Sequence, residues 1–281
     1  MSLTEKPHSS AHTDPGRKRK QNQDSIHMDD SHGLWIVADG MGGHQGGEIA
    51  SAIACEEIPQ QIAAGVQLEE ALRCAHRKIV QRGSQQPELR GLGTTVVVVR
   101  DLGTDYEIAW SGDSRIYRWR HGKLVQRSED HSIVQRMLKS GLISEQQAKV
   151  HPHQHVISSC LGSTSNEGLE IGYQQDTWEK DDWLLLCSDG LTDELDDTRI
   201  ASILSRHKDR ASACDALLQA ALDAGGRDNV SVALIEAPAD APAGIAPRKS
   251  LVPWLLGAAA VLTLVGLALL AFDYWQHLHR G

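Results

Sequence analysis

The chain has 281 residues, a length that fits one large domain or two small ones. Its hydrophobic fraction of 41% and charged fraction of 23% are those of an ordinary globular protein, which excludes a chain that is disordered throughout. The formal net charge of -9 argues against nucleic acid as a partner. The five cysteines are scattered and form no C-x-x-C pair, which argues against a disulfide framework or a zinc site and indicates a reducing compartment.

The N-terminal residues 1–15 are polar and lack the apolar stretch of a secretory signal. We expect them to form a flexible N-terminus. Over residues 16–236, apolar residues follow strand-like and helix-like patterns in turn, without an internal repeat. The sequence therefore predicts one globular domain over 16–236.

Runs of β-branched and aromatic residues predict several strands in this domain. The predicted strands cover residues 33–38, 94–100, 106–111, 115–120, 183–187 and 230–235. Two connections, over residues 102–105 and 121–122, contain glycine and are typical of hairpin turns. We therefore expect most of the sheet to be antiparallel.

Apolar residues at helical spacing predict helices over residues 47–64, 68–82 and, in two pieces, 197–224. The apolar faces of antiparallel sheets need cover, and helices grouped apart from the strands can supply it. The predicted fold class is therefore α+β: a β-sandwich of two mainly antiparallel sheets flanked by helices, in the layer order α-β-β-α.

The C-terminal part of the chain differs in composition from the globular domain. Residues 237–250 are rich in Ala and Pro, which predicts a semi-rigid linker. Residues 251–272 are apolar or small except for Thr263, and about 20 such residues can cross a bilayer as a helix. We predict a transmembrane helix over 251–272, followed by a short tail over 273–281.

Basic residues beside this segment predict its orientation. Arg248 and Lys249 precede it, whereas only Arg280 follows, so the positive-inside rule puts the globular domain in the cytoplasm. Trp254 and Trp275 lie near its ends, as interfacial aromatic residues do. The alternative is a buried core helix, which is less favoured because a soluble domain rarely ends in so uniformly apolar a segment.

Four aspartates stand at ends of predicted strands, beside small or turn-forming residues: Asp39, Asp113, Asp189 and Asp228. A carboxylate at a strand end is held rigidly at the rim of a sheet, and a neighbouring glycine lets ligands approach closely. Any one Asp-Gly is more often a turn, but several converging carboxylates would repel one another unless cations joined them. Oxygen ligands without histidine or thiolate select Mg²⁺ or Mn²⁺, and a pair of such ions can ionise a bridging water for attack on phosphorus.

Eight sequence elements extend this pattern along nearly the whole globular region. They are RKQNQDS, VADGMGGH, GTT, SGDSR, EDHS, LG, CSDGL and GRDNVS, which begin at residues 19, 37, 93, 111, 129, 161, 187 and 226. In type and order they resemble the metal-dependent (type-2C) serine/threonine protein phosphatases. Met41 stands where some eukaryotic relatives carry a histidine, so the pattern is similar to that of bacterial members.

The resemblance implies roles for the metal-site residues. Asp39, Asp189 and Asp228 would ligate two central Mn²⁺ or Mg²⁺ ions, with the Gly40 carbonyl completing one of them, and Asp113 would ligate a third, weaker ion. These roles are carried over from the family pattern and not from spacing.

The resemblance also implies roles for the N-terminal element. Asp24 would hold a metal-bound water from behind, and Arg19 would bind the substrate phosphate by paired N–H bonds. Gln23 stands where relatives usually carry a glutamate ligand, so we expect a weaker, neutral metal ligand there.

The segment 128–161 is similar to the flap beside the family's catalytic cleft. It contains His151, His153 and His155, whose alternation raises a transition-metal site as a less favoured alternative to a solvated flap segment.

The function implied is a protein phosphatase that hydrolyses phosphoserine or phosphothreonine by attack of a water bridging two Mg²⁺ or Mn²⁺ ions. Its partners would be phosphorylated proteins, made by a serine/threonine kinase, and the membrane through the C-terminal helix. We expect a single-pass protein of the bacterial inner membrane with a cytoplasmic catalytic domain. The alternatives are a catalytically weak phosphoprotein-binding or scaffolding module at the membrane and, less favoured, a two-metal phosphodiesterase; the complete aspartate set favours the phosphatase.

Overall fold

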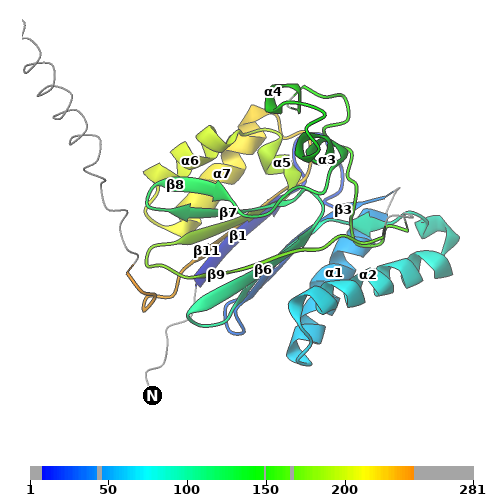
Figure 1. The fold of residues 1–281 in the computed structure, drawn as a ribbon, viewed down its shortest axis with the longest axis horizontal. Coiled ribbons are helices and arrows are strands. Elements are labelled where there is room, and N and C mark those ends of the chain that lie inside the picture. The colour runs from blue at the N-terminus through cyan, green and yellow to red at the C-terminus, as the bar shows by residue number, and fades with distance from the viewer. Residues whose placement is uncertain (1–7, 43–45, 149, 165–167, 244–281) are drawn as a thin grey trace, which may run out of the picture. The chain divides into compact units, whose positions relative to one another are not determined.

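The computed structural model describes residues 8–42, 46–148, 150–164 and 168–243. Two antiparallel sheets pack face to face, and helices cover the outer face of each (Figure 1). This arrangement confirms the predicted α+β sandwich of two antiparallel sheets flanked by helices.

The first sheet has five strands, and all its neighbours run antiparallel. In spatial order they are β1 (His8–Asp14), β11 (Val230–Glu236), β10 (Trp183–Cys187), β7 (Arg115–Arg120) and β8 (Lys123–Gln126). β7 and β8 form a hairpin through His121 and Gly122, whose φ angles of 52° and 74° fit the tight turn predicted there.

The second sheet has six strands. In order they are β2 (Asp24–Asp29), β3 (Leu34–Met41), β5 (Val96–Asp101), β6 (Asp105–Ser111) and β9 (Gly172–Thr177), with the short β4 (Gly93–Thr94) also paired to β3. The predicted hairpin between β5 and β6 is closed by the Leu102 amide, which donates to the Asp105 carbonyl at 2.8 Å.

Both faces of the central strands are buried, which explains their nearly continuous apolar sequences. In β3, Trp35 and Val37 point into the core between the sheets, while Leu34, Ile36 and Ala38 face the helices outside. Successive side chains of a strand alternate between faces, so a strand covered on both sides needs apolar residues at every position.

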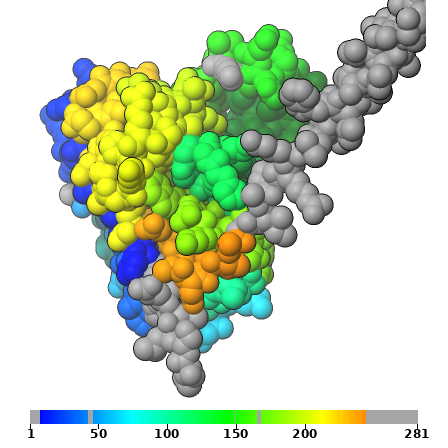
Figure 2. Space-filling view, turned by 90° about the vertical axis from the view of Figure 1, so that its left-hand side faces the viewer, coloured from blue at the N-terminus to red at the C-terminus, as the bar shows by residue number. Residues whose placement is uncertain are grey.

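Two helix pairs cover the sandwich (Figure 1). α1 (Gly46–Ala63) and α2 (Leu68–Gln85) pack on the second sheet, and α6 (Asp197–Arg206) and α7 (Arg210–Ala224) pack on the first. Figure 2 shows the face that α6 and α7 cover, in yellow. The apolar stripe predicted for α2 is the buried face that its Leu68, Leu72, Ala75 and Ile79 form.

Short helices complete the chain around one end of the sandwich. These are η1 (Pro87–Leu89), α3 (Ile133–Lys139), α4 (Glu145–Ala148) and α5 (Asp189–Thr192). α3 and α4 belong to the segment 128–161 that we expected to resemble a flap, and they lie above the same end of the sheets as α5 (Figure 1). None of the four was predicted, because each is too short for an apolar period to emerge.

The N-terminal segment corrects one expectation. Residues 8–14 are not a flexible extension but strand β1, which pairs in register with β11 from His8 opposite Glu236 to Asp14 opposite Val230. This strand could not be predicted because its sequence, HSSAHTD, is almost wholly polar. Its position depends on backbone pairing to the buried strand β11. Residues 1–7 lie outside the described residues.

The C-terminal boundary also differs from the prediction. Beyond Glu236, the Ala237 amide donates to the Asp182 carbonyl at 2.9 Å, and the Lys180 amide donates to the Pro242 carbonyl at 2.9 Å. The first residues of the predicted linker 237–250 therefore contact the domain.

The predicted transmembrane helix over 251–272 and the tail over 273–281 lie outside the described residues, as does the rest of the linker. Among the helices of the described part, none combines the length and apolar character of a membrane span.

A buried ion pair lies at one end of the first sheet. Asp182, which precedes β10, is 0% exposed, and its carboxylate accepts hydrogen bonds from Arg120 Nε at 2.6 Å and Nη2 at 2.5 Å. Arg120 ends β7 and also donates to the Thr177 carbonyl at the end of β9, at 3.0 Å. The ion pair therefore fixes the Arg120 side chain, and the hydrogen bond to Thr177 ties the end of β7 in the first sheet to the end of β9 in the second.

We predict that Asp182→Ala lowers the free energy of unfolding by about 3 kcal/mol, because it leaves the Arg120 charge buried without this partner. Glu70→Ala, which breaks the exposed pair between Glu70 and Arg77 at 2.7 Å, serves as the control and should change stability little. Urea unfolding of both variants measures the difference. Equal losses in the two variants would contradict a structural role for the buried pair.

Candidate active site

The four predicted aspartates meet at one end of the sandwich. Asp39 lies near the end of β3, Asp113 follows β6, Asp189 begins α5 directly after β10, and Asp228 precedes β11. All four line one hollow of about 520 Å³, here called the central hollow, together with Arg19, Gln23 and Gly40. Both sheets thus contribute to the site, as expected from carboxylates at strand ends.

Close backbone approaches at two glycines bring these elements together. A Cβ atom on Gly40 would lie 2.1 Å from the Gly47 carbonyl oxygen at the start of α1. A Cβ atom on Gly190 would lie 2.0 Å from the Asn229 carbonyl oxygen. Any side chain at either position would therefore push apart the segments that carry the aspartates.

The two threonines of the GTT element fix the backbone of Asp39. Thr94 Oγ1 and the Thr95 amide both donate to the Asp39 carbonyl at 2.9 Å, and the Asp39 amide donates to Thr95 Oγ1 at 3.3 Å. The threonine hydroxyls therefore hold a ligand candidate from a neighbouring strand.

The EDHS element supports Asp113 in a similar way. The Gly112 amide donates to His131 Nδ1 at 3.3 Å, and the His131 amide donates to the Gly112 carbonyl at 2.8 Å. Arg115 grips the Asp130 carboxylate through Nε at 3.0 Å and Nη2 at 2.7 Å. These contacts hold the turn that carries Asp113 against the flap segment.

Asp24 lies behind the central hollow, opposite Asp39 in the β2–β3 pair. Its Oδ2 accepts hydrogen bonds from Ser188 Oγ at 2.9 Å and Ser231 Oγ at 2.6 Å, while its buried Oδ1 has no hydrogen-bond partner. Burial raises the pKa of Asp24 to about 6, against the opposing effect of the two serine hydroxyls. The two serines were not predicted, although both stand in elements of the family pattern.

Burial dominates the electrostatics of the aspartate cluster. It raises the pKa of Asp39 well above its ordinary range, and repulsion from Asp24, Asp189 and Asp113 adds to the shift. Burial and the charge of Asp189 raise the pKa of Asp113 to about 8, and burial and the charge of Asp193 raise that of Asp189 to about 6. Deprotonating this cluster costs free energy unless positive charge arrives with it.

The unpartnered oxygens of the cluster fit hard divalent cations. Oδ1 of Asp113 and Oδ1 of Asp189 are buried without hydrogen-bond partners. Buried carboxylate oxygens without partners are costly, and Mg²⁺ or Mn²⁺ is the natural ligand for an all-oxygen set. The residues present therefore suit the predicted cofactor.

The side-chain oxygens of the four aspartates do not surround a common point in this structure. Among the described residues, no three His, Cys, Asp or Glu side chains have the geometry of a metal site. Instead, Arg19 Nη2 donates to Asp228 Oδ2 at 2.7 Å. Arg19 is 57% exposed, so this ion pair can exchange readily.

Gln23 lies at the wall of the central hollow. The backbone N–H of Gln23 donates to Asn229 Oδ1 at 2.9 Å. Its backbone carbonyl accepts from the Gly40 N–H at 3.2 Å and from Ser51 Oγ at 2.6 Å. The backbone of Gln23 thus links β3, α1 and the loop before β11. Its role as a metal ligand stays a prediction.

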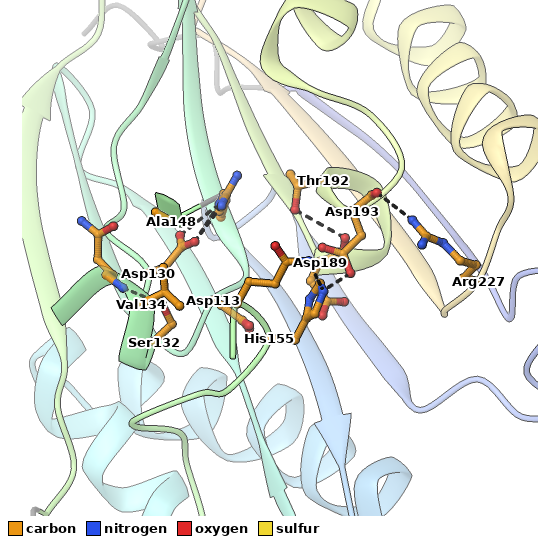
Figure 3. A pocket seen from close by; sticks show the side chains of 13 residues that line it. Asp113, Asp130, Ser132, Val134, Ala148, His155, Asp189, Thr192, Asp193 and Arg227 are labelled. Atoms are coloured by element: carbon orange, nitrogen blue, oxygen red, sulfur yellow. Dashed lines mark hydrogen bonds and ion pairs between the residues drawn. The ribbon is translucent and has the colours of Figure 1, made fainter. Parts of the chain in front are cut away.

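A second hollow, of about 410 Å³, lies between the flap segment and α5 (Figure 3). Figure 3 shows Asp130 and Ser132 on one side and Asp193 and Arg227 on the other. Asp193 was not predicted, although its spacing of four residues from Asp189 puts both on one face of a helical turn. Burial raises the pKa of the Asp193 carboxyl, against the opposing effect of the nearby His155.

The three flap histidines do not converge on one point. His155 turns toward α5, with Nδ1 3.3 Å from Asp193 Oδ2, whereas the rings of His151 and His153 lie 5.6 Å apart. The alternative of a transition-metal site gains no support from this arrangement.

Comparison with known proteins agrees with the geometry. The sequence model of the family Protein phosphatase 2C matches residues 16–224. The chain belongs to the protein phosphatase 2C family. The predicted enzyme class, a metal-dependent protein-serine/threonine phosphatase, and the predicted Mn²⁺ or Mg²⁺ cofactor are thereby confirmed.

Relatives cover nearly the whole domain. The chain is 33% identical over 242 residues to the serine/threonine phosphatase stp of Listeria welshimeri, covering 82% of this chain and 95% of that protein. It is 34% identical over 235 residues to the protein phosphatase PhpP of Streptococcus pneumoniae, covering 79% of this chain and 94% of that protein.

Solved structures of similar phosphatases share the fold. The serine/threonine phosphatase PstP/Ppp of Mycobacterium tuberculosis superposes with a TM-score of 0.76 at 30% identity, covering 83% of this chain and 99% of that one. A structure of the PstP catalytic domain with two manganese ions gives a TM-score of 0.73 at 30% identity, covering 82% and 98%.

Proposed function

We propose that this phosphatase hydrolyses phosphoserine and phosphothreonine in proteins, with two divalent cations held by Asp39, Asp189, Asp228 and the Gly40 carbonyl. The observation that carries the proposal is the carboxylate cluster of the central hollow, in which Oδ1 of Asp113 and Oδ1 of Asp189 are buried without hydrogen-bond partners. When bound, the two ions supply Lewis acidity and lower the pKa of a water molecule that acts as the nucleophile.

Arg19 binds and orients the substrate phosphate in this proposal. Its guanidinium lies at the rim of the central hollow, and its present partner is Asp228 at 2.7 Å. A phosphate dianion offers two oxygens to the planar guanidinium, which makes it a better partner than one carboxylate oxygen. Binding of substrate would therefore free the Asp228 carboxylate from Arg19.

Asp24 orients the nucleophile from behind. Two serine hydroxyls occupy its Oδ2, which leaves Oδ1 as the oxygen that can accept a hydrogen bond from water. A carboxylate fixed in this way positions a water without contacting the cation itself.

Two further ligands complete the proposed site. The family pattern assigns Asp113 to a third, weaker ion, and Asp113 lines both the central hollow and the second hollow beside the flap segment. Gln23 stands where relatives usually carry a charged glutamate ligand, and it offers a neutral amide instead. We assign this amide to the central ions.

The proposed cellular setting rests on the sequence outside the described residues. The apolar segment 251–272 and the basic Arg248 and Lys249 support a single-pass anchor in the bacterial inner membrane, with the catalytic domain in the cytoplasm. Its substrates would be phosphorylated proteins, which the similarity to serine/threonine phosphatases supports, and we propose that a serine/threonine kinase makes them.

We predict that Asp39→Asn or Asp189→Asn lowers turnover of a phosphothreonine peptide by orders of magnitude, because either change removes a charge that holds the cations. Asp215→Asn, at a side chain that is 69% exposed on α7, is the matched control and should keep full activity. Phosphate release with saturating Mn²⁺ measures turnover, and thermal melting checks the fold. A chain that binds the peptide but releases no phosphate, with or without the substitutions, would favour the alternative of a binding module.

We predict that Gln23→Glu lowers the Mn²⁺ concentration needed for half-maximal activity, because a full negative charge binds a hard cation more tightly than an amide dipole. Gln21→Glu adds the same charge at an exposed neighbouring position and controls for long-range attraction. Titration of Mn²⁺ with a small phosphoester gives the two concentrations. An unchanged or higher requirement in Gln23→Glu would remove Gln23 from the ligand set and leave the aspartates in place.

We predict that the full chain sediments with membranes and resists carbonate extraction, whereas a chain that ends at residue 243 stays in the supernatant and remains active. The physical reason is that an apolar helix of about 20 residues inserts almost irreversibly. Protease added to intact spheroplasts tests the orientation. Digestion of the catalytic domain under those conditions would overturn the proposed topology.

A further inference from the structure

A third hollow adjoins the central one and takes no part in the proposed chemistry. It measures about 750 Å³, larger than the central hollow, and lies between the end of α2, the segment from η1 to β4, and residues 160–164. Met41 at the end of β3 lines both hollows, so the two meet at this residue. We call it the side hollow.

Close packing beneath the side hollow makes it a formed feature of the fold. A Cβ atom on Gly83 would lie 2.5 Å from Leu92 Cδ2, and one on Gly93 would lie 3.0 Å from the Leu161 carbonyl. The Gly162 amide donates to His76 Nδ1 at 3.1 Å, which ties this floor to α2. A side chain at Gly93 would press on the Leu161 backbone, whereas one at Gly83 would have to move the Leu92 side chain.

The floor of the side hollow is apolar. Met41, Val80, Leu92 and Cys160 line it, and Cys160 is only 8% exposed. Burial raises the pKa of the Cys160 thiol to about 11, so it is neutral and acts as a small apolar group. A methionine thioether adapts its shape to whatever packs against it. The floor therefore suits an apolar side chain.

The rim of the side hollow is polar and carries one cation. Ser84 and Thr164 are exposed there, and so is Arg90. Among the described residues, no carboxylate lies within ion-pair distance of the Arg90 guanidinium. In a chain with a net charge of -9, such a cation at the edge of a hollow favours an acidic group of a ligand.

Geometry limits what can reach this hollow. A phosphorylated residue whose phosphate contacts Arg19 carries polypeptide on both sides, and an extended chain advances about 3.3 Å per residue. Residues on one side of it can then pass Met41, which lines both hollows, and reach the side hollow. A small phosphoester without flanking polypeptide would not enter it.

We propose that the side hollow binds the substrate polypeptide beside the phosphorylated residue, with an apolar side chain on Met41 and Leu92 and a carboxylate at Arg90. This inference rests on the proposed function and adds a sequence preference to it. Arg90 is then a specificity-determining residue that touches neither the cations nor the phosphate.

The test uses the full-length protein with Arg90→Glu and Ser84→Trp, the second of which fills the hollow from an exposed helical position. Arg82→Glu and Gln85→Trp are matched controls, because both positions are exposed near the end of α2 and neither lines the hollow. One substrate is p-nitrophenyl phosphate. The others are phosphothreonine peptides that carry an apolar residue and a Glu on one side of the phosphothreonine or on the other. A matched set of peptides has Lys in place of the Glu.

We expect Ser84→Trp to lower kcat/KM for the Glu peptide about tenfold through KM, and Arg90→Glu about fivefold, with hydrolysis of p-nitrophenyl phosphate unchanged. Arg90→Glu should also prefer the Lys peptide over the Glu peptide, reversing the preference of the unaltered protein. The two controls should behave like the unaltered protein with every substrate.

Two outcomes would overturn the inference while leaving the proposed function intact: unchanged peptide kinetics in both variants, or equal losses with peptide and small ester. Failure of the proposed function is distinguishable, because the unaltered protein would then hydrolyse neither substrate with Mn²⁺.

Discussion

The crowding of partly buried carboxylates, whose loss of hydration and repulsion both oppose ionisation, is the constraint on which the rest of this structure depends. Asp39, Asp113 and Asp189 line one hollow, and burial together with repulsion from neighbouring carboxylates raises the pKa of each. A single flexible segment would relieve such repulsion by moving apart. Here the carboxylates are carried by elements of both sheets and are braced by threonine, serine and histidine contacts, so the fold retains the strain until cations relieve it.

This constraint explains why most residues of the sequence pattern position the aspartates and do not themselves take part in the reaction. The GTT and EDHS elements hold the backbones of Asp39 and Gly112. The hydroxyls of Ser188 and Ser231 both donate to the Asp24 carboxylate. The glycines at 40 and 190 allow the segments to touch. Most conspicuous residues around the site therefore keep the acidic groups in position, and few of them would meet a substrate.

The sequence allowed prediction of the buried half of the fold and of the lining of the site. β7 and β10 were predicted at their observed bounds because β-branched and aromatic residues mark a buried strand. β1 and β9 were missed because their sequences, HSSAHTD and GYQQDT, are polar, and partners distant in the chain determine their pairing. The ion pair from Arg19 to Asp228 was also beyond prediction, because 209 residues separate its members.

The pairing of β1 with β11 has a consequence for how the protein is made. The first and last described strands are neighbours in one sheet, so that sheet lacks its edge until residue 236 has been synthesised. The loop after β1 also carries Arg19, whose partner Asp228 is near the end of the domain. A nascent chain would therefore expose unpaired strand edges through most of its translation, and contacts of such long sequence separation form slowly. Phosphatase activity can then arise only after the whole domain has emerged, so a truncated translation product would be inert.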